Sequence, residues 1–374
     1  MKTRTITTIK GFYELKNSWS SLFKKIKQDN PFLSWEWNYY WCKNYGINTN
    51  IRIICIEDNE ELVAVVPLQI KSKTIMFLSD PVFSDYMDLL ILNRSDSILN
   101  SIYSAITKLN GWNKILLLTL KDSSPNTQFI IRILKKLNLY FNKENIHLNP
   151  VIDLSLDYND NFNLVNNKVR KEIRRTTRIL DKEDNNWKFH STTINNSKSI
   201  LKTLFSHHLN RQTNKVGTSI FDSDKNRTFF NNLKYNLNED FKLHFAGIYF
   251  KEKYVTASMS IIFNNVFYYW ITSFDPSFKQ GSIGNYHINL LIKDAYDYKL
   301  KRFDFMGGTE TYKLRWTKTC RNNYQLIAFK SFYFLKLYNF KVYLRSLLLK
   351  CKDNSKVLKK LWITISKIYE KNKL

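Results

Sequence analysis

Residues 266–300 read VFYYWITSFDPSFKQGSIGNYHINLLIKDAYDYKL. The first nine residues are rich in aromatic and β-branched side chains, which predicts a buried strand. The glycine-containing segment KQGSIGN follows at residues 279–285, and beyond it apolar residues recur at helical spacing up to about residue 300. The stretch therefore predicts a strand, a glycine turn and a helix N-terminus in direct succession.

This succession suits the binding of a pyrophosphate. The first N–H groups of a helix have no partner within the helix, and they lie at the positive end of its dipole. Four of the nine glycines in the chain fall between residues 281 and 308, and residues without side chains let phosphates approach the backbone. An ordinary strand-to-helix turn is the alternative. The anion site is expected to comprise Gln280, Gly281, Ser282, Ile283, Gly284 and Asn285.

The flanking sequence repeats one order of elements in each half of the chain. The second half has predicted strands at 243–250, 255–263 and 266–274, a helix from about 284 to 300 and a strand at 302–306. The first half has predicted strands at 51–57, 62–70 and 74–80. They are followed by a helix at 95–109, a strand at 114–120 and a helix at 127–137. The pattern predicts an α/β fold of two related halves with mixed sheets. Pro150 follows a polar stretch and marks the expected boundary, giving domains 1–150 and 151–330 and a basic helical tail, 331–374.

Several segments resemble GNAT acyltransferases, and more closely the CelD/BioF-like acetyltransferases, which are related to Fem-type transferases with paired GNAT halves. They include FLSWEWNYYW (32–41), KVRKEIRRTTRIL (168–180), the loop KQGSIGN and FDFMGGTETYKLRW (303–316). The resemblance implies an acetyl-CoA or other acyl-CoA donor held at the glycine loop, and an acceptor between the halves. The common GNAT loop has a basic residue or Gln three positions before its first glycine, whereas Phe278 stands there in this chain. The first half has no such loop and is expected to bind no cofactor.

Candidate catalytic groups follow the last strand of the second half. Asp304 alternates with two phenylalanines and is expected to point to the opposite face, as a base or acceptor-binding group; a structural ion pair is the alternative. Glu310, Tyr312 and Lys313 come directly after it. Tyr312 is a candidate general acid for the thiolate, and Lys313 a candidate ligand for an anionic acceptor.

Three further residues are candidates on weaker patterns. His208 is a candidate general base because the unperturbed pKa of histidine is near neutrality, although a helical histidine is commonly structural. Asp85 and Asp88 of the first half can hydrogen-bond acceptor hydroxyls or cap local structure. No cysteine or histidine spacing predicts a metal site.

Two segments concentrate positive charge. Residues 165–180 form a basic amphipathic helix with four arginines, including Arg175, which either faces an anionic substrate or is simply solvated. Residues 330–374 carry 12 Lys or Arg and 2 acidic residues, a charge of +10 out of the formal +26 of the chain. The tail is expected either to lie on an anionic membrane or to pack on the catalytic domain.

These features lead to one main hypothesis and two alternatives. The main hypothesis is acylation of an amine or hydroxyl on a small-molecule or saccharide acceptor in surface polysaccharide synthesis of a bacterium, the process implied by the resemblance. The alternatives are Fem-type transfer from aminoacyl-tRNA to a cell-wall precursor, and a non-catalytic membrane or nucleic-acid binding protein, of which nucleic-acid binding is the less expected. No signal peptide or membrane span is apparent, so a cytoplasmic location, with peripheral contact at the inner membrane face, is expected.

Overall fold

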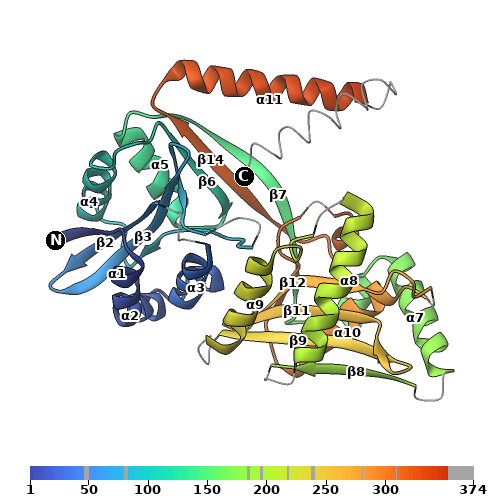
Figure 1. The fold of residues 1–374 in the computed structure, drawn as a ribbon. Coiled ribbons are helices and arrows are strands. Elements are labelled where there is room, and N and C mark those ends of the chain that lie inside the picture. The colour runs from blue at the N-terminus through green and yellow to red at the C-terminus, as the bar shows by residue number, and fades with distance from the viewer. Residues whose placement is uncertain are drawn as a thin grey trace.

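The computed structural model describes residues 1–45, 50–79, 83–182, 186–193, 197–216, 219–236, 241–279, 281–308 and 310–352. Its strands form two connected mixed sheets with helices packed on both, as Figure 1 shows. The predicted α/β class with two similar halves is confirmed. Within these residues, no helix is long and apolar enough to cross a membrane.

The first sheet has the strand order β1-β2-β3-β4-β6-β14-β7. Three helices, α1–α3, precede its hairpin strands, and two more, α4 and α5, flank β6. The bounds are β1 (Lys2–Ile6), α1 (Ile9–Glu14), α2 (Lys16–Ile26), α3 (Trp35–Tyr45), β2 (Asn50–Asp58), β3 (Glu61–Lys71), β4 (Thr74–Phe77), β5 (Leu90–Ile91), α4 (Asp96–Thr107), β6 (Lys114–Lys121) and α5 (Asn126–Lys136).

The second sheet continues the order as β13-β12-β11-β9-β10, with β8 paired to β9. Four helices, α7–α10, pack on it, and α11 follows the last strand. The bounds are α6 (Tyr158–Leu164), α7 (Asn167–Asp181), β8 (Trp187–Thr192), α8 (Lys198–Val216), α9 (Asp224–Asn236), β9 (Phe241–Phe250), β10 (Lys253–Tyr254), β11 (Thr256–Phe263), β12 (Val266–Phe274), α10 (Ile283–Asp297), β13 (Arg302–Asp304), β14 (Cys320–Phe329) and α11 (Phe332–Lys352).

The polar stretch before Pro150 is a long strand, β7 (Tyr140–Asp153), which joins the two sheets. As far as Pro150 it pairs with β14, and from Val151 it pairs with β13. Proline has no N–H to donate, so it is tolerated where the pairing changes. Strand β14 later returns the chain to the first sheet, so the domain bounds 1–150 and 151–330 stay a prediction.

Two apolar cores lie on opposite faces of the second sheet. One, under α7 and α10, contains Ile173, Leu291 and Phe303. The other, under α8 and α9, continues into the first half, where Trp37 packs edge to face against Phe229. The shared core fixes the two halves against each other.

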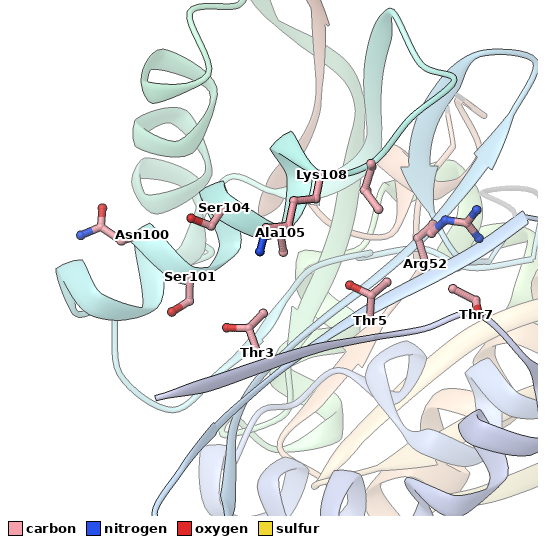
Figure 2. A pocket seen from close by; sticks show the side chains of 10 residues that line it. Thr3, Thr5, Thr7, Arg52, Asn100, Ser101, Ser104, Ala105 and Lys108 are labelled. Atoms are coloured by element: carbon pink, nitrogen blue, oxygen red, sulfur yellow. The ribbon is translucent and has the colours of Figure 1, made fainter.

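An open groove of about 560 Å³ lies in the first half, between β1, β2 and α4 (Figure 2). Hydroxyl side chains such as Thr5 and Ser104 line it, together with Arg52 and Lys108. This groove is formed by elements of the first sheet and its helices, whereas the predicted glycine loop belongs to the second sheet.

Candidate acyl-transfer site

The glycine loop adopts its shape by packing on α7. Gly281 has φ +66°, a conformation that L side chains rarely adopt, and a Cβ at this position would lie 2.5 Å from Thr176 Oγ1. The same oxygen accepts a hydrogen bond of 2.9 Å from the Ser282 N–H. Gly281 is therefore required by the contact between the loop and α7. The predicted ligand Gln280 lies outside the described residues.

The N-terminus of α10 presents unpartnered donors. Ser282 is the N-cap residue, but its hydroxyl donates to Glu172 on α7 and does not cap its own helix. Within the described part of the chain, the N–H groups of Ile283, Gly284 and Asn285 have no acceptor. A Cβ on Gly284 would be 3.5 Å from Phe274, an ordinary contact, so protein packing does not require glycine there. Three free N–H groups beside a position without a side chain fit a phosphate group.

Basic residues of α7 extend this anion site. An open groove of about 450 Å³ runs along the helix and is lined by Asn167, Lys168, Lys171, Glu172 and Arg175. The Glu172 carboxylate accepts a hydrogen bond of 2.7 Å from Asn285 Nδ2, which places this groove next to the loop. Three cations against one carboxylate leave the groove positive. Arg175 and the loop, predicted separately, are thus brought together.

Beyond the loop, strands β12 and β13 diverge. Their parallel pairing covers only Val266–Tyr268 of β12, opposite Arg302–Asp304. From Tyr269 to Phe274, β12 has no partner strand on that side among the residues that the structure describes. The divergence leaves this part of β12 able to form backbone hydrogen bonds with an extended ligand. The glycine loop follows the same strand, so one ligand could contact both.

Two tyrosines face each other at the start of this opening. Burial raises the pKa of Tyr312 well above its usual value, and the neighbouring Tyr269 and Glu310 raise it further. Burial raises the pKa of Tyr269 to about 12. Both phenols therefore keep their protons at neutral pH. The guanidinium of Arg211 lies 4.4 Å from the centre of the Phe274 ring and lowers the pKa of both phenols to a smaller extent.

A compact turn joins this pair of phenols to the first half. Lys313 Nζ is buried, donates to Gly307 O at 2.8 Å and lies 3.3 Å from the half-exposed Glu310 carboxylate. Asp85, from the first half, accepts a hydrogen bond of 2.9 Å from the Gly307 N–H. His147 Nε2, on β7, lies 3.8 Å from Asp85 Oδ1. The structure thus brings Asp85, Glu310, Tyr312 and Lys313 into one region.

The titration of Asp85 and His147 reflects their burial. Burial raises the pKa of the Asp85 carboxyl, with an opposing effect from its bond to Gly307. Burial also lowers the pKa of His147, against the attraction of Asp85. Both shifts favour the neutral forms of the two side chains.

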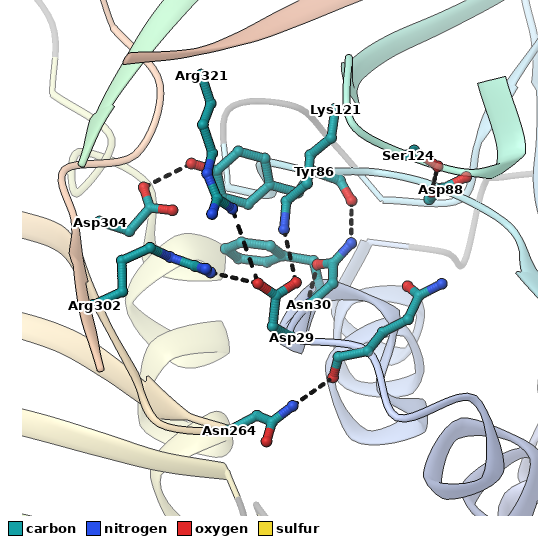
Figure 3. A network of polar contacts seen from close by, with 12 residues as sticks. Asp29, Asn30, Tyr86, Asp88, Lys121, Ser124, Asn264, Arg302, Asp304 and Arg321 are labelled. Atoms are coloured by element: carbon teal, nitrogen blue, oxygen red, sulfur yellow. Dashed lines mark hydrogen bonds and ion pairs between the residues drawn. The ribbon is translucent and has the colours of Figure 1, made fainter. Parts of the chain in front are cut away.

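Asp304 lies on the other face of the sheet, as its alternation with Phe303 and Phe305 predicts. It is fully buried, and its Oδ1 accepts hydrogen bonds from Tyr86 Oη (2.7 Å) and Met306 N (2.8 Å). Its Oδ2 has no hydrogen-bond partner among the described residues. Figure 3 shows Asp304 beside Tyr86 at the junction of the halves. Its role as a base stays a prediction.

A second carboxylate at this junction is surrounded by cations. Asp29 lies 3.1 Å from Lys121 of β6, pairs with Arg302 of β13 and lies 4.0 Å from Arg321 of β14 (Figure 3). The cations outweigh the effect of burial and hold the pKa of Asp29 well below its usual range. This cluster ties the first helices to strands of both sheets.

The remaining predicted residues lie in local structures. His208 accepts from or donates to Ser219 Oγ at 2.8 Å, and burial, assisted by Arg211, lowers its pKa to about 4. Asp88 is buried and accepts hydrogen bonds from Ser124, Asn126 and the Leu89 N–H. Its hydrogen bonds to the described residues lie within the first half, and none of them joins it to the turn after β13. No group of three or more His, Cys, Asp or Glu in the described ranges is placed to hold a metal ion.

Sequence reasoning missed several contributors to the site. Thr176 and Glu172 belong to the basic helix. Its sequence indicates the excess of cations but not that these two polar side chains contact the loop. Tyr269 has the alternation of a strand residue, but its partner is 43 positions away. His147 lies in the polar stretch before Pro150, where only a domain boundary is predicted.

Comparisons with known proteins give one family match and several similar folds. Residues 167–314 match the family model described as an acetyltransferase (GNAT) domain. No curated protein sequence is significantly similar to the chain. The fold is similar to that of FemX, at 12% identity and a TM-score of 0.57 over 88% of this chain and 97% of that one.

Two further solved structures have similar folds. The C-terminal domain of a putative lysylphosphatidylglycerol synthetase from Agrobacterium fabrum is 9% identical, with a TM-score of 0.53 over 84% of this chain and 92% of that one. The L-PGS from Bacillus licheniformis is 11% identical, with a TM-score of 0.51 over 88% and 94%. The chain therefore has a fold similar to that of FemX, and residues 167–314 match a GNAT acetyltransferase domain.

Proposed function

We propose that the protein transfers an acyl group from acyl-CoA to an amine or hydroxyl of an acceptor that binds between the two halves. The observation that carries this proposal is the N-terminus of α10, where the N–H groups of Ile283, Gly284 and Asn285 have no acceptor among the described residues and lie beside a groove lined by three cations. The diphosphate of the donor would lie on these groups. Its chain would follow the unpaired part of β12 towards Tyr269.

The chemistry needs one proton removed and one supplied. The acceptor attacks the thioester carbon and loses a proton, the C–S bond breaks, and the thiolate takes up a proton to leave as a thiol. We assign the second proton to Tyr312, because its raised pKa keeps the phenol protonated and it lies against the opening of the strands. The product is an amide or ester and free CoA.

For the base, position favours Glu310 over Asp304. Glu310 acts on the pKa of Tyr312 and is half exposed, so its carboxylate can reach an acceptor. Asp304 is fully buried, points to the other face of β13 and already accepts two hydrogen bonds. Lys313 and Asp85 would then position the acceptor. A saccharide acceptor in surface polysaccharide synthesis remains the preferred class, on the family resemblance.

The second candidate is aminoacyl transfer from a charged tRNA. The similarity of fold to FemX and to lysylphosphatidylglycerol synthetases favours it. The same basic groove on α7 would then hold RNA phosphates, and Glu172 at the N-terminus of α10 would weaken the binding of a diphosphate. A cytoplasmic location serves either donor.

A thermal shift measurement with acetyl-CoA and longer acyl-CoAs tests the choice. A donor at about 100 times its dissociation constant should add about 2.7 kcal/mol to the free energy of unfolding. Gly284→Asp should abolish the shift, because it places a carboxylate where a phosphate would bind. Gly284→Ala is the control for folding, because its Cβ fits at 3.5 Å from Phe274, so this variant without ligand should melt no earlier than the wild type.

The outcomes separate the two candidates. A shift with acyl-CoA that Gly284→Asp removes supports the proposal. No shift with any acyl-CoA, together with product formation from aminoacyl-tRNA, would establish the second candidate. Failure with both donors would leave a binding protein without catalysis.

A further inference from the structure

Helix α11 (Phe332–Lys352) is attached to the body by its first two turns. Leu335 is buried, Tyr338 Oη donates to Glu144 at 2.9 Å and Asn339 Oδ1 accepts from Asn142 Nδ2 at 2.7 Å. From residue 339 to residue 347 every residue is exposed. Figure 1 shows the helix extending from the end of the first sheet.

The exposed part carries a continuous apolar face. Large side chains follow at intervals of four and three residues, which places them on one side of a helix. They are Tyr333 (68% exposed), Leu337, Phe340 (56%), Leu344 and Leu347, and Phe332 and Tyr343 flank them; Phe334 and Val342 are also exposed, on other sides of the helix. At 100° per residue, Leu335 and Tyr338 lie on a different side, so the face points away from the body.

The charge of the helix has a single sign. Residues 332–352 contain Lys336, Lys341, Arg345, Lys350 and Lys352 and no acidic residue. Lys336 lies beside the apolar row, and its Nζ is 4.8 Å from the centre of the Phe332 ring. A lysine in this arrangement can reach past a buried face to an anionic layer.

We infer that α11 is a docking surface for an anionic lipid bilayer, with its apolar face in the headgroup region and its cations against lipid phosphates. Aromatic and aliphatic side chains mixed with lysines are typical of helices that lie in the membrane interface. A second copy of the chain is a poorer occupant, because two such helices would bring the lysines at positions 336 and 341 of both copies together. The inference goes beyond acyl transfer and does not depend on the donor or the acceptor.

Co-sedimentation of the full chain with vesicles tests it, without any substrate. We expect strong binding to phosphatidylcholine vesicles in which about a third of the lipid is phosphatidylglycerol, and weak binding to phosphatidylcholine alone. Phe340→Glu/Leu344→Glu should lower the partition coefficient roughly 100-fold, about tenfold for each large side chain kept out of the interface. Lys336→Gln/Lys341→Gln should lower it about 25-fold, roughly fivefold per charge.

The matched control is Leu156→Glu/Leu164→Glu, which makes the same change at two exposed leucines of the second half. It should bind as the wild type does. Equal binding of the wild type to both vesicles, or unchanged binding of Phe340→Glu/Leu344→Glu, would overturn the inference. A dimer in sedimentation velocity that the same glutamates dissociate would assign the face to a second copy instead.

Discussion

Two glycines three residues apart should respond in opposite ways to alanine. Gly281→Ala introduces a side chain at φ +66°, which costs roughly 1–2 kcal/mol, and its Cβ would lie 2.5 Å from Thr176 Oγ1. Moving Thr176 away breaks its bond with the Ser282 N–H, a further loss of roughly 0.5–1.5 kcal/mol. We therefore expect the free energy of unfolding to fall by about 2–3 kcal/mol. Gly284→Ala meets ordinary contacts in a helix and should raise it by about 0.5–1 kcal/mol.

Urea unfolding of the full chain, followed by tryptophan fluorescence and circular dichroism, measures both changes. Thr176→Ala removes the hydroxyl that Gly281→Ala would strike. The double variant should therefore be less unstable than the sum of the single changes, by at least about 0.5 kcal/mol. Additive losses, or a loss below about 1 kcal/mol for Gly281→Ala, would show that α7 does not pack on the loop as described.

Three further outcomes are expected. Glu310→Gln should lower turnover at least ~100-fold. Asp304→Asn should lower it less than ~10-fold, because Asp304 accepts a hydrogen bond from Tyr86 on the other face of the sheet. The reverse ranking would make Asp304 the base. The pKa of His208 is about 4 in the folded protein and near 6.5 in the unfolded chain, so the native state binds fewer protons between these values. The free energy of unfolding should therefore fall as the pH drops from about 6.5 to 4. His208→Gln should flatten that slope in urea titrations across this range, and an unchanged slope would contradict the assignment. The pKa of Asp29 is also depressed, so Asp29→Asn should be less stable than wild type at neutral pH, and the difference should shrink in unfolding curves below about pH 4.

The local parts of this molecule could be predicted from sequence. The strand Val266–Phe274, the loop and the helix α10 follow from aromatic content, glycine placement and helical spacing, which are properties of adjacent residues. The hairpins of both halves are equally local. Their two-residue turns, such as Asn59-Glu60 and Asn264-Asn265, have positive φ at both positions, the geometry that joins twisted strands.

The rest depends on partners that are distant in sequence. Strand β7 is polar because much of it is solvent-exposed on its faces, and it is a strand because β14 pairs with its backbone about 180 residues later in the chain. Asp85 and His147, from two separate segments, lie at the turn after β13. Hydrophobic periodicity does not predict contacts between such distant residues. The alternation of residues 303–305 predicts the face on which Asp304 lies. It does not predict the hydrogen bond that Asp304 accepts from Tyr86, which is 218 positions earlier in the chain.

Strand β14 also has a consequence for how the protein is made. It lies between β6 and β7, in the interior of the first sheet, although it is synthesised after the whole of the second sheet. During translation, the edges of β6 and β7 that pair with β14 therefore stay unpaired until residue 329 has left the ribosome. Shorter chains, whether nascent or truncated by design, would expose two strand edges that invite aggregation. The two halves must mature together, and a fragment that ends near residue 150 is a poor choice for expression.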